Sequence, residues 1–308
     1  MLLGFAVPQA GSWATPERIV ATARRAEELG YASLWTFQRL LYPADPARSE
    51  QPERWAPVYR SVHDPVVTLA FLAAHTSRVR LGVAVLNMPW FSPLLLAKQA
   101  STLDAVSGGR LDLGLGLGWA REEYAATGAP QGRRGDRAED FVRTLQAIWT
   151  QDVVEVAGEF SELHDVRVEP RPVQQPHPPI LLGGSAEPAL RRAGRMTDGW
   201  ISSSGHDLTS IGASIEVVRS GAREAGRDPT LLRFICRGAV RVREAGRPER
   251  RPLTGSYDEI AADLEVLAGQ GVTETFLDLN FDRQVGTVDA DPEASMYRAY
   301  ELLEVFAP

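Results

Sequence analysis

The segment from Ser107 to Trp119, Ser-Gly-Gly-Arg-Leu-Asp-Leu-Gly-Leu-Gly-Leu-Gly-Trp, constrains the fold of this chain more than any other. It reads as the end of a helix followed by a strand. Because strand side chains alternate between two faces, the leucines share one face and the glycines leave bare backbone on the other. The two sets are Leu111, Leu113, Leu115 and Leu117, and Gly114, Gly116 and Gly118. If the leucines pack against helices, the glycines open space inside the sheet for a flat ligand.

The same glycines allow two other interpretations, a glycine-rich turn or a dinucleotide-binding loop. A dinucleotide loop places its glycines in the turn before a helix, with an acidic residue about 20 positions later. Here the glycines lie within the strand, and arginines dominate the residues that follow. We therefore favour the strand.

The composition is that of an ordinary globular protein. The chain has 308 residues, 44% of them hydrophobic and 24% charged, and no apolar run approaches the ~20 residues of a membrane span. Its first residues lack the basic region of a signal peptide, and its one cysteine, Cys236, excludes an internal disulfide. The net charge of −7 argues against nucleic-acid binding. We expect a cytoplasmic protein with one domain, residues 1–308, and no membrane or nucleic-acid partner.

Short apolar strands alternate with capped helices along the chain, which predicts βα units around a parallel sheet. The candidate strands number eight and favour a closed barrel with strands at Leu2–Val7, Ser33–Thr36, Val79–Val85, Leu111–Leu117, Ile180–Gly183, Gly199–Ser202, Leu232–Val240 and Thr273–Leu279. Helix starts are marked by Thr15, Asp64, Ser92 and Asp291, each followed by proline, and by Ser256 with Glu259 as a capping box. Gly30 and Gly108 mark helix ends.

Two segments interrupt the alternation. The segment Phe37–His63 contains four prolines with Tyr42, Trp55 and Tyr59, and a connection of this length is typical of a lid over a binding site. The segment Val153–Pro179 could be an interdomain linker, but we favour an insertion before the fifth strand, because the βα pattern resumes at Ile180.

A candidate anion site follows the fifth strand. Ile180–Leu190 reads as a strand, a glycine pair and a helix whose N-terminus offers free N–H groups, with Ser185 either beside the anion or only an N-cap. No metal site is indicated, because the histidines are scattered at positions 63, 75, 164, 177 and 206.

Three segments, Ser107–Trp119, Arg171–Gly184 and Arg192–Ile201, resemble the bacterial luciferase-like superfamily, and more closely its coenzyme F420-dependent oxidoreductase branch. The similarity runs from the first strand to about Ser204. It implies a (β/α)8 TIM barrel with an insertion before strand 5, a homodimer, and a deazaflavin or flavin lying across the carboxyl end of the barrel. The alternative cofactor is FMN.

The resemblance also implies where the cofactor binds. Its phosphate would meet the glycine pair and the helix starting at Ser185, and a bulge in the third strand, in some relatives with a non-prolyl cis peptide, would support the ring from behind. The residues so implied are Ala84, Val85, Gly116, Gly118, Gly183, Gly184, Ser185, Ser202 and Ser203.

The chain departs from the family at the reactive face. Members commonly carry an Asp-His pair after the second strand, and Gln38 and Arg39 stand there instead. Arginine is always charged and cannot serve as an ordinary general acid. We expect Arg39 to stabilise an anionic reduced cofactor, to bind a substrate carboxylate, or to pair with an acidic neighbour.

Trp119 occupies the position of a carboxylate found in sugar-oxidising relatives, which argues against sugar-phosphate oxidation. It would be an apolar wall for the substrate or ordinary packing. Glu122 and Glu123 are proton relays or first-turn residues of the next helix. Tyr59 and His63 of the lid are candidate substrate contacts.

The leading functional hypothesis is an F420-dependent oxidoreductase that transfers a hydride between the deazaflavin and a small organic substrate, in the direction of reducing an activated C=C or C=N bond. An FMN-dependent monooxygenase on the same barrel is the first alternative. A non-catalytic cofactor-binding protein is the second, because the Asp-His pair is missing.

Overall fold

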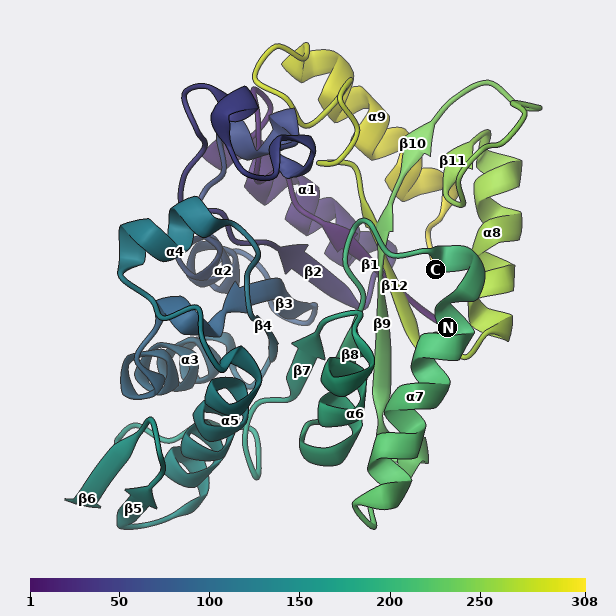
Figure 1. Cartoon of the computed structure of the whole chain (residues 1–308). Helices are drawn as coiled ribbons and strands as arrows, with labels where there is room; N and C mark the ends of the chain where they lie inside the picture. Colours follow the sequence, from purple (N-terminus) through teal and green to yellow (C-terminus); the bar gives the residue numbers. More distant parts are fainter.

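The computed structural model describes residues 1–308, and eight parallel strands form a closed barrel at its centre in the order β1-β12-β9-β8-β7-β4-β3-β2 (Figure 1). All eight predicted strands are present, so the predicted (β/α)8 barrel is confirmed. The barrel strands are β1 Leu2–Ala6, β2 Ser33–Thr36, β3 Arg80–Asn87, β4 Leu111–Gly116, β7 Ile180–Gly183, β8 Gly199–Ile201, β9 Arg233–Ala239 and β12 Glu274–Asp278.

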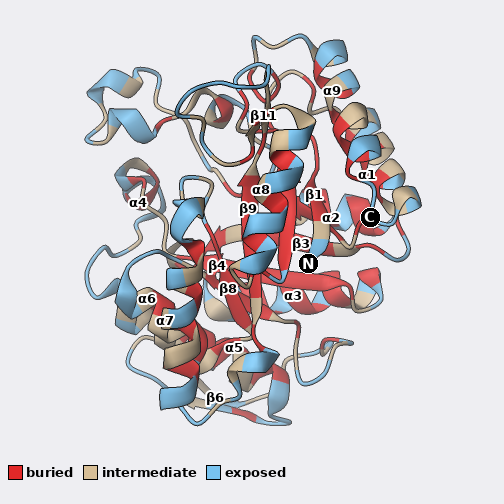
Figure 2. Cartoon of the chain, turned by 90° about the vertical axis from the view of Figure 1, so that its right-hand side faces the viewer, coloured by how far each residue is buried: buried red, intermediate tan, exposed pale blue.

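Helices surround the barrel and bury the faces that they turn towards it, while their outer faces are exposed (Figure 2). Their bounds are α1 Pro16–Leu29, α2 Pro65–Ala73, α3 Pro93–Ser107, α4 Arg121–Thr127, α5 Arg134–Thr150, α6 Glu187–Met196, α7 Ile211–Glu224, α8 Tyr257–Gly269 and α9 Pro292–Val305. None of them is both long enough and apolar enough to cross a lipid bilayer.

The predicted helix ends agree with the structure almost throughout. The Thr15, Asp64 and Asp291 side chains accept capping hydrogen bonds, and Ser256 forms the capping box with Glu259. Ser92 occupies the N-cap of α3, although its side chain makes no capping bond. Gly30 and Gly108 end α1 and α3 with φ of 93° and 68°, the left-handed conformation that glycine adopts without strain.

The expected insertion is an antiparallel hairpin of β5 (Val154–Ala157) and β6 (Glu162–Val166), which projects from α5 outside the barrel (Figure 1). A second small sheet pairs β10 (Arg241–Val242) with β11 (Thr254–Gly255) beyond the carboxyl end of β9. The lid, Phe37–His63, carries three 3-10 turns, and an isolated bridge between Ala10 and Val62 attaches its end to the β1–α1 connection.

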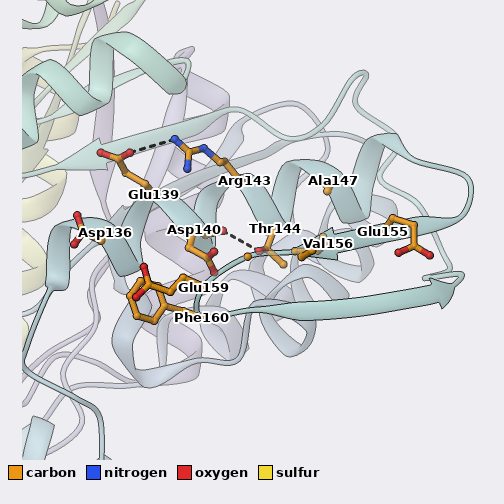
Figure 3. A pocket seen from close by; sticks show the side chains of 12 residues that line it. Asp136, Glu139, Asp140, Arg143, Thr144, Ala147, Glu155, Val156, Glu159 and Phe160 are labelled. Atoms are coloured by element: carbon orange, nitrogen blue, oxygen red, sulfur yellow. Dashed lines mark hydrogen bonds and ion pairs between the residues drawn. The ribbon is translucent and has the colours of Figure 1, made fainter.

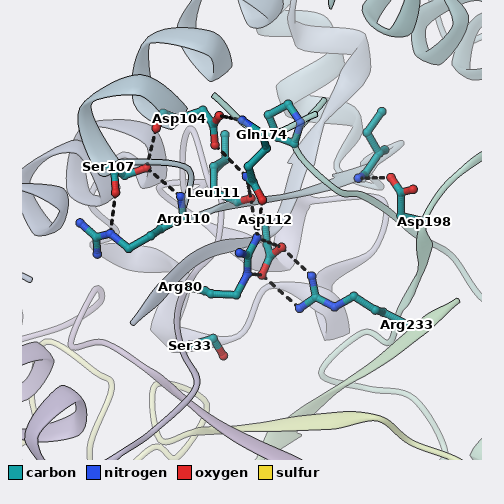
Figure 4. Close-up of polar contacts among 12 residues, drawn as sticks. Ser33, Arg80, Asp104, Ser107, Arg110, Leu111, Asp112, Gln174, Asp198 and Arg233 are labelled. Atoms are coloured by element: carbon teal, nitrogen blue, oxygen red, sulfur yellow. Dashed lines mark hydrogen bonds and ion pairs between the residues drawn. The ribbon is translucent and has the colours of Figure 1, made fainter. Parts of the chain in front are cut away.

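Charged residues close the amino-terminal end of the barrel. Asp112 on β4 is fully buried and accepts hydrogen bonds from Arg80 at 2.6 and 2.8 Å and from Arg233 at 2.6 and 3.1 Å (Figure 4). Arg233 also reaches Glu274 at 3.1 Å. A buried carboxylate is tolerated when cations satisfy it, so this network supports the barrel from the end opposite the candidate site.

Candidate functional site

The carboxyl ends of the barrel strands form a mouth that the lid partly covers. In a parallel barrel all these ends lie on one side, so residues distant in sequence meet there. Phe37, Trp55 and Val58 of the lid are buried, and Phe37 and Val58 pack with Ala10 of the β1–α1 connection and with Phe281 after β12. The predicted site residues are therefore expected to gather at this mouth.

The bulge expected in the third strand is present. The β3–β4 register shifts between Val83 and Leu86, and the Ala84–Val85 peptide bond is cis. The bulge turns towards the glycines of β4, because a Cβ atom on Gly114 would lie 2.0 Å from the Val83 carbonyl oxygen.

The expectation of open space beside these glycines is wrong. A Cβ on Gly116 would lie 2.5 Å from Val85 Cγ2, and one on Gly118 would lie 3.0 Å from the Trp90 ring. The Val85 and Trp90 side chains therefore occupy the space that the sequence left open. Gly114 and Gly116 therefore accommodate the β3 bulge itself, because any side chain at these positions would collide with Val83 or Val85.

A buried arginine that the sequence analysis missed fixes the same bulge. Arg237 on β9 donates from Nη1 to the Ala84 carbonyl oxygen at 2.9 Å and from Nε to Asp278 Oδ2 at 2.8 Å. Its backbone N–H donates to Ser202 Oγ at 3.0 Å. A charged residue inside the apolar run Phe234–Val240 was the available signal, because an arginine in a central strand needs a buried partner.

Gln38 is buried directly after β2. Its side-chain oxygen accepts hydrogen bonds from the Asn87 backbone N–H at 2.8 Å and from Asn87 Nδ2 at 3.2 Å, so it anchors the end of β3. The Gln38 side-chain nitrogen makes no hydrogen bond within the protein and is a donor available to a ligand.

Arg39 lies in an aromatic layer and is paired with an acid, as one of the three expected roles requires. Its side chain is 7% exposed and its Nη1 lies 3.0 Å from Glu123 Oε2, while its Nε is buried without a partner. Its guanidinium carbon lies 4.6 Å from the ring centroid of Tyr59, 4.9 Å from Trp119 and 5.5 Å from Trp55. The planar guanidinium cation and the aromatic rings attract one another through cation–π interactions in this arrangement.

Burial dominates the ionisation of this pair. Loss of solvent raises the pKa of the Glu123 carboxyl, against the lowering effects of Arg39 and of the Leu40 and Leu41 backbone. The same burial lowers the pKa of Arg39, against Glu123. Glu123 also accepts the Leu40 N–H at 2.7 Å, so it holds the start of the lid as well as Arg39. Glu122 bonds instead to Ser49 of the lid.

The remaining predicted contacts fall in different places. Trp119 is partly buried, 4.9 Å from Trp55 between ring centroids, and forms one wall of the aromatic layer with Tyr59. The Tyr59 hydroxyl makes no hydrogen bond within the protein. His63 is exposed at the end of the lid, where its Nε2 lies 2.8 Å from the Ala14 carbonyl oxygen. The structure therefore groups Tyr59 and Trp119 with Arg39 and leaves His63 apart.

The glycine pair after β7 provides backbone donors. The N–H groups of residues 184–187 donate no hydrogen bond within the protein, and these residues are exposed. Gly184 has φ of 136°, and its carbonyl accepts a hydrogen bond from Trp200 Nε1 at 2.8 Å. Four free N–H groups at a helix start suit an oxyanion.

Two details around this turn differ from expectation. Helix α6 begins at Glu187 with Ala186 at the N-cap, so Ser185 precedes the cap instead of forming it. The Ser202 hydroxyl is buried and bound to the Arg237 backbone, while the Ser203 side chain is exposed. Ser185 and Ser203 are thus the hydroxyls that remain accessible to an anion.

Pockets on the surface lie beside this mouth or away from it. A cleft of 540 Å³ is lined only by α5 and the β5–β6 hairpin, with Asp136, Glu139 and Asp140 among its acidic residues (Figure 3). A pocket of 520 Å³ lies between the lid and the loop that follows β12, and one of 370 Å³ lies between the lid and the segments that follow β9 and β12. The first contains no residue from the carboxyl end of a barrel strand, so it does not belong to the candidate site.

Solved structures share this architecture along the whole chain. The monooxygenase RslO1 of Streptomyces bottropensis superposes with a TM-score of 0.79 at 22% identity and covers 99% of this chain and 98% of its own. The F420-dependent tetrahydromethanopterin reductase of Methanopyrus kandleri gives 0.75 at 16% identity, covering 99% and 97%. At these identities the likeness shows the fold alone.

Sequence relatives are closer. The FMNH2-dependent dimethylsulfone monooxygenase of Pseudomonas putida is 36% identical over 167 residues, which are 53% of this chain and 46% of that enzyme, so the match spans about half its length. The uncharacterised protein Rv0953c of Mycobacterium tuberculosis is 32% identical over 269 residues, covering 81% and 92%. Residues 2–274 match the family model of luciferase-like monooxygenases. The chain is therefore a member of the luciferase-like monooxygenase family of oxidoreductases.

Proposed function

We propose that this protein is an F420-dependent oxidoreductase that reduces an activated C=C or C=N bond of a small organic substrate. The observation that carries the proposal is the row of four free backbone N–H groups at residues 184–187, on the barrel end that also carries the β3 bulge. The F420-dependent reductase of Methanopyrus kandleri has the same fold, which supports the deazaflavin.

The residues at the mouth fit a phosphate-bearing deazaflavin or flavin. Gly183 is partly exposed at the start of this turn, and a Cβ added to it would meet only ordinary van der Waals contacts, the nearest being Val85 Cγ1 at 3.4 Å. The N–H row and the Ser185 and Ser203 hydroxyls would hold the phosphate. Ala84 and Val85, held by Arg237, would face the ring. When bound, the deazaflavin supplies hydride transfer at a ring carbon.

This chain's own residues would orient the reactants and exclude water. The Arg39–Glu123 pair and the rings of Tyr59 and Trp119 form a nearly dry wall beside the mouth. The Gln38 side-chain nitrogen is positioned to donate a hydrogen bond, and the Tyr59 hydroxyl is available as a proton donor. Arg39 is already paired with Glu123 at 3.0 Å, so it serves this wall as one half of an ion pair.

An FMN-dependent monooxygenase is the second candidate, favoured by the 36% identity with the FMNH2-dependent dimethylsulfone monooxygenase. Parallel titration of the purified protein with oxidised F420 and with FMN, followed by tryptophan fluorescence, separates the two. Trp55 and Trp119 lie at the mouth and would report occupancy. Tight binding of F420 alone supports the proposal, and preference for FMN replaces it with the monooxygenase. If the protein binds neither F420 nor FMN, both candidate functions are wrong. If it binds a cofactor but turns over no acceptor, it is a non-catalytic cofactor-binding protein.

We also propose a homodimer. Adjacent helices α2 and α3 expose apolar side chains, with Val67 69% and Leu95 64% accessible, and a second copy would cover them. Light scattering should give twice the chain mass for the native protein and the single chain mass for a Val67→Asp, Leu95→Asp variant. A native protein of single mass would remove this proposal.

A further inference from the structure

The 370 Å³ pocket at the barrel mouth combines an apolar wall with an arginine cluster. Pro57 and Val58 of the lid and Phe281 after β12 form the apolar side, and Arg241, Arg243 and Arg283 contribute the charged side. The lid and two separate strand ends thus converge on one cavity.

The charges in this pocket are not balanced. Asp282 is the one acidic residue in the lining, and Arg243 occupies both of its oxygens at 2.7 and 2.8 Å. The Arg241 guanidinium makes a single contact, to the Phe281 carbonyl oxygen at 3.5 Å, the outer limit of a hydrogen bond. Arg283 forms no ion pair. The guanidinium groups of Arg241 and Arg283 are therefore left without a carboxylate.

Burial deepens this imbalance at Arg241, whereas Arg283 is exposed at the rim of the pocket. The Arg241 side chain is half-buried, and loss of solvent lowers its pKa, against Asp282, with Arg251, Arg243 and Arg283 adding to the lowering. Like charges gathered in a cleft focus a positive potential, although the chain as a whole carries a net charge of −7. An oxyanion would satisfy the free N–H groups and relieve the repulsion.

The pocket adjoins the aromatic layer of the candidate site. The Phe281 ring lies 5.8 Å from Tyr59 and 5.4 Å from Phe37 between centroids, and Tyr59 in turn lies under Arg39. A small molecule seated against Phe281 would therefore lie beside the ring layer that contacts Arg39.

We propose that this pocket binds the anionic group of the substrate, a carboxylate, sulfonate or phosphate, through Arg241 and Arg283, with the apolar body against Pro57, Val58 and Phe281. The proposal rests on the proposed function in placing the substrate at the barrel mouth. It narrows the substrate class to small organic anions.

The test uses probes of one shape and different charge, titrated into the cofactor-free protein by calorimetry. Benzoate, benzenesulfonate and phenylphosphonate are the anions, and benzamide is the neutral match. We expect at least one anion to bind tenfold or more tightly than benzamide. Arg241→Gln should lower the affinity for that anion at least tenfold, and Arg283→Gln should lower it at least threefold. Arg143→Gln removes the same charge from an exposed ion pair on α5 and should leave binding within twofold.

Equal binding of benzamide and all three anions, or undiminished anion binding by both Arg241→Gln and Arg283→Gln, would overturn the proposal. An equal loss in Arg143→Gln would also overturn it, because overall charge would then explain the affinity. The same variants are titrated with F420 and FMN. Unchanged cofactor affinity supports assignment to the substrate, and loss of cofactor affinity with preserved anion binding overturns it. Because the anion titration needs neither cofactor nor turnover, its result is independent of the proposed function.

Discussion

Arg237 on β9 donates a hydrogen bond to the carbonyl oxygen of Ala84 on β3 at 2.9 Å, and so connects two strands that are not neighbours in the barrel. The same guanidinium is paired with the fully buried Asp278 at 2.8 Å. The position of the β3 bulge at the mouth thus depends on a charge from the opposite side of the barrel.

Replacing Arg237 with methionine should lower the free energy of unfolding by about 3–5 kcal/mol, because Asp278 would be left buried without a cation. Urea denaturation measures the loss. The double variant Arg237→Met, Asp278→Asn removes both charges and should recover at least a third of it. A double variant no more stable than the single one would show that the ion pair is not the reason.

The Arg39–Glu123 pair predicts a pH-dependent loss of stability. Arg39→Met removes the cation that opposes the burial effect, so the pKa of the Glu123 carboxyl rises further above its ordinary value of 4.5. A raised folded-state pKa means that the folded protein binds the proton first, so stability increases as pH falls through that pKa and decreases as pH rises through it.

Urea midpoints of Arg39→Met should therefore fall furthest below those of the native protein near pH 7.5, and the difference should shrink towards pH 5. The control, Arg39→Met with Glu123→Gln, has no carboxyl to titrate at this position, so its urea midpoints should depend less on pH than those of Arg39→Met. A deficit in the single variant that is independent of pH would contradict the assignment. Turnover by both variants should decrease or the substrate KM should rise, because Arg39 lies in the wall of the site.

Gly183 provides a cleaner test of the phosphate site than Gly184. A Cβ on Gly184 would lie 2.8 Å from Ala189 Cβ, and its φ of 136° disfavours other residues, so Gly184→Val would disturb the fold. Gly183→Ala meets only ordinary contacts, the nearest at 3.4 Å. We expect cofactor affinity to fall at least tenfold with a melting temperature within a few degrees of the native value. If Gly183→Ala binds the cofactor with native affinity, the phosphate does not bind at this turn.

The seating of the β3 bulge can be tested by compensation. Gly116→Ala would place its methyl 2.5 Å from Val85 Cγ2, and overpacking of this kind costs about 1–3 kcal/mol. Val85→Ala removes the obstructing methyl, so the double variant should be more stable than Gly116→Ala alone. Gly114→Ala meets the Val83 carbonyl oxygen, and no side-chain change should rescue it. Chemical denaturation of the four variants gives the comparison.

Local signals were sufficient for the architecture. The eight strands, the helix starts at Thr15, Asp64 and Asp291, and the stops at Gly30 and Gly108 each depend on residues within a few positions of one another. Alternating leucine and glycine in β4 likewise marked a strand with one crowded and one bare face. Such patterns are readable because capping, periodicity and backbone preference act over one or two turns.

Closure of the barrel determined which side chains meet at the candidate site. The partner of Arg39 lies 84 positions away in Glu123, and Arg237 reaches Ala84 across 153 positions. Closure also filled the bare face of β4 with Val85, a side chain from the neighbouring strand. The sequence by itself determined which segments become strands and helices and that their carboxyl ends share one mouth. Only the tertiary structure determined which charges meet there, because burial forces each buried charge to find a partner wherever the closed barrel brings one within reach.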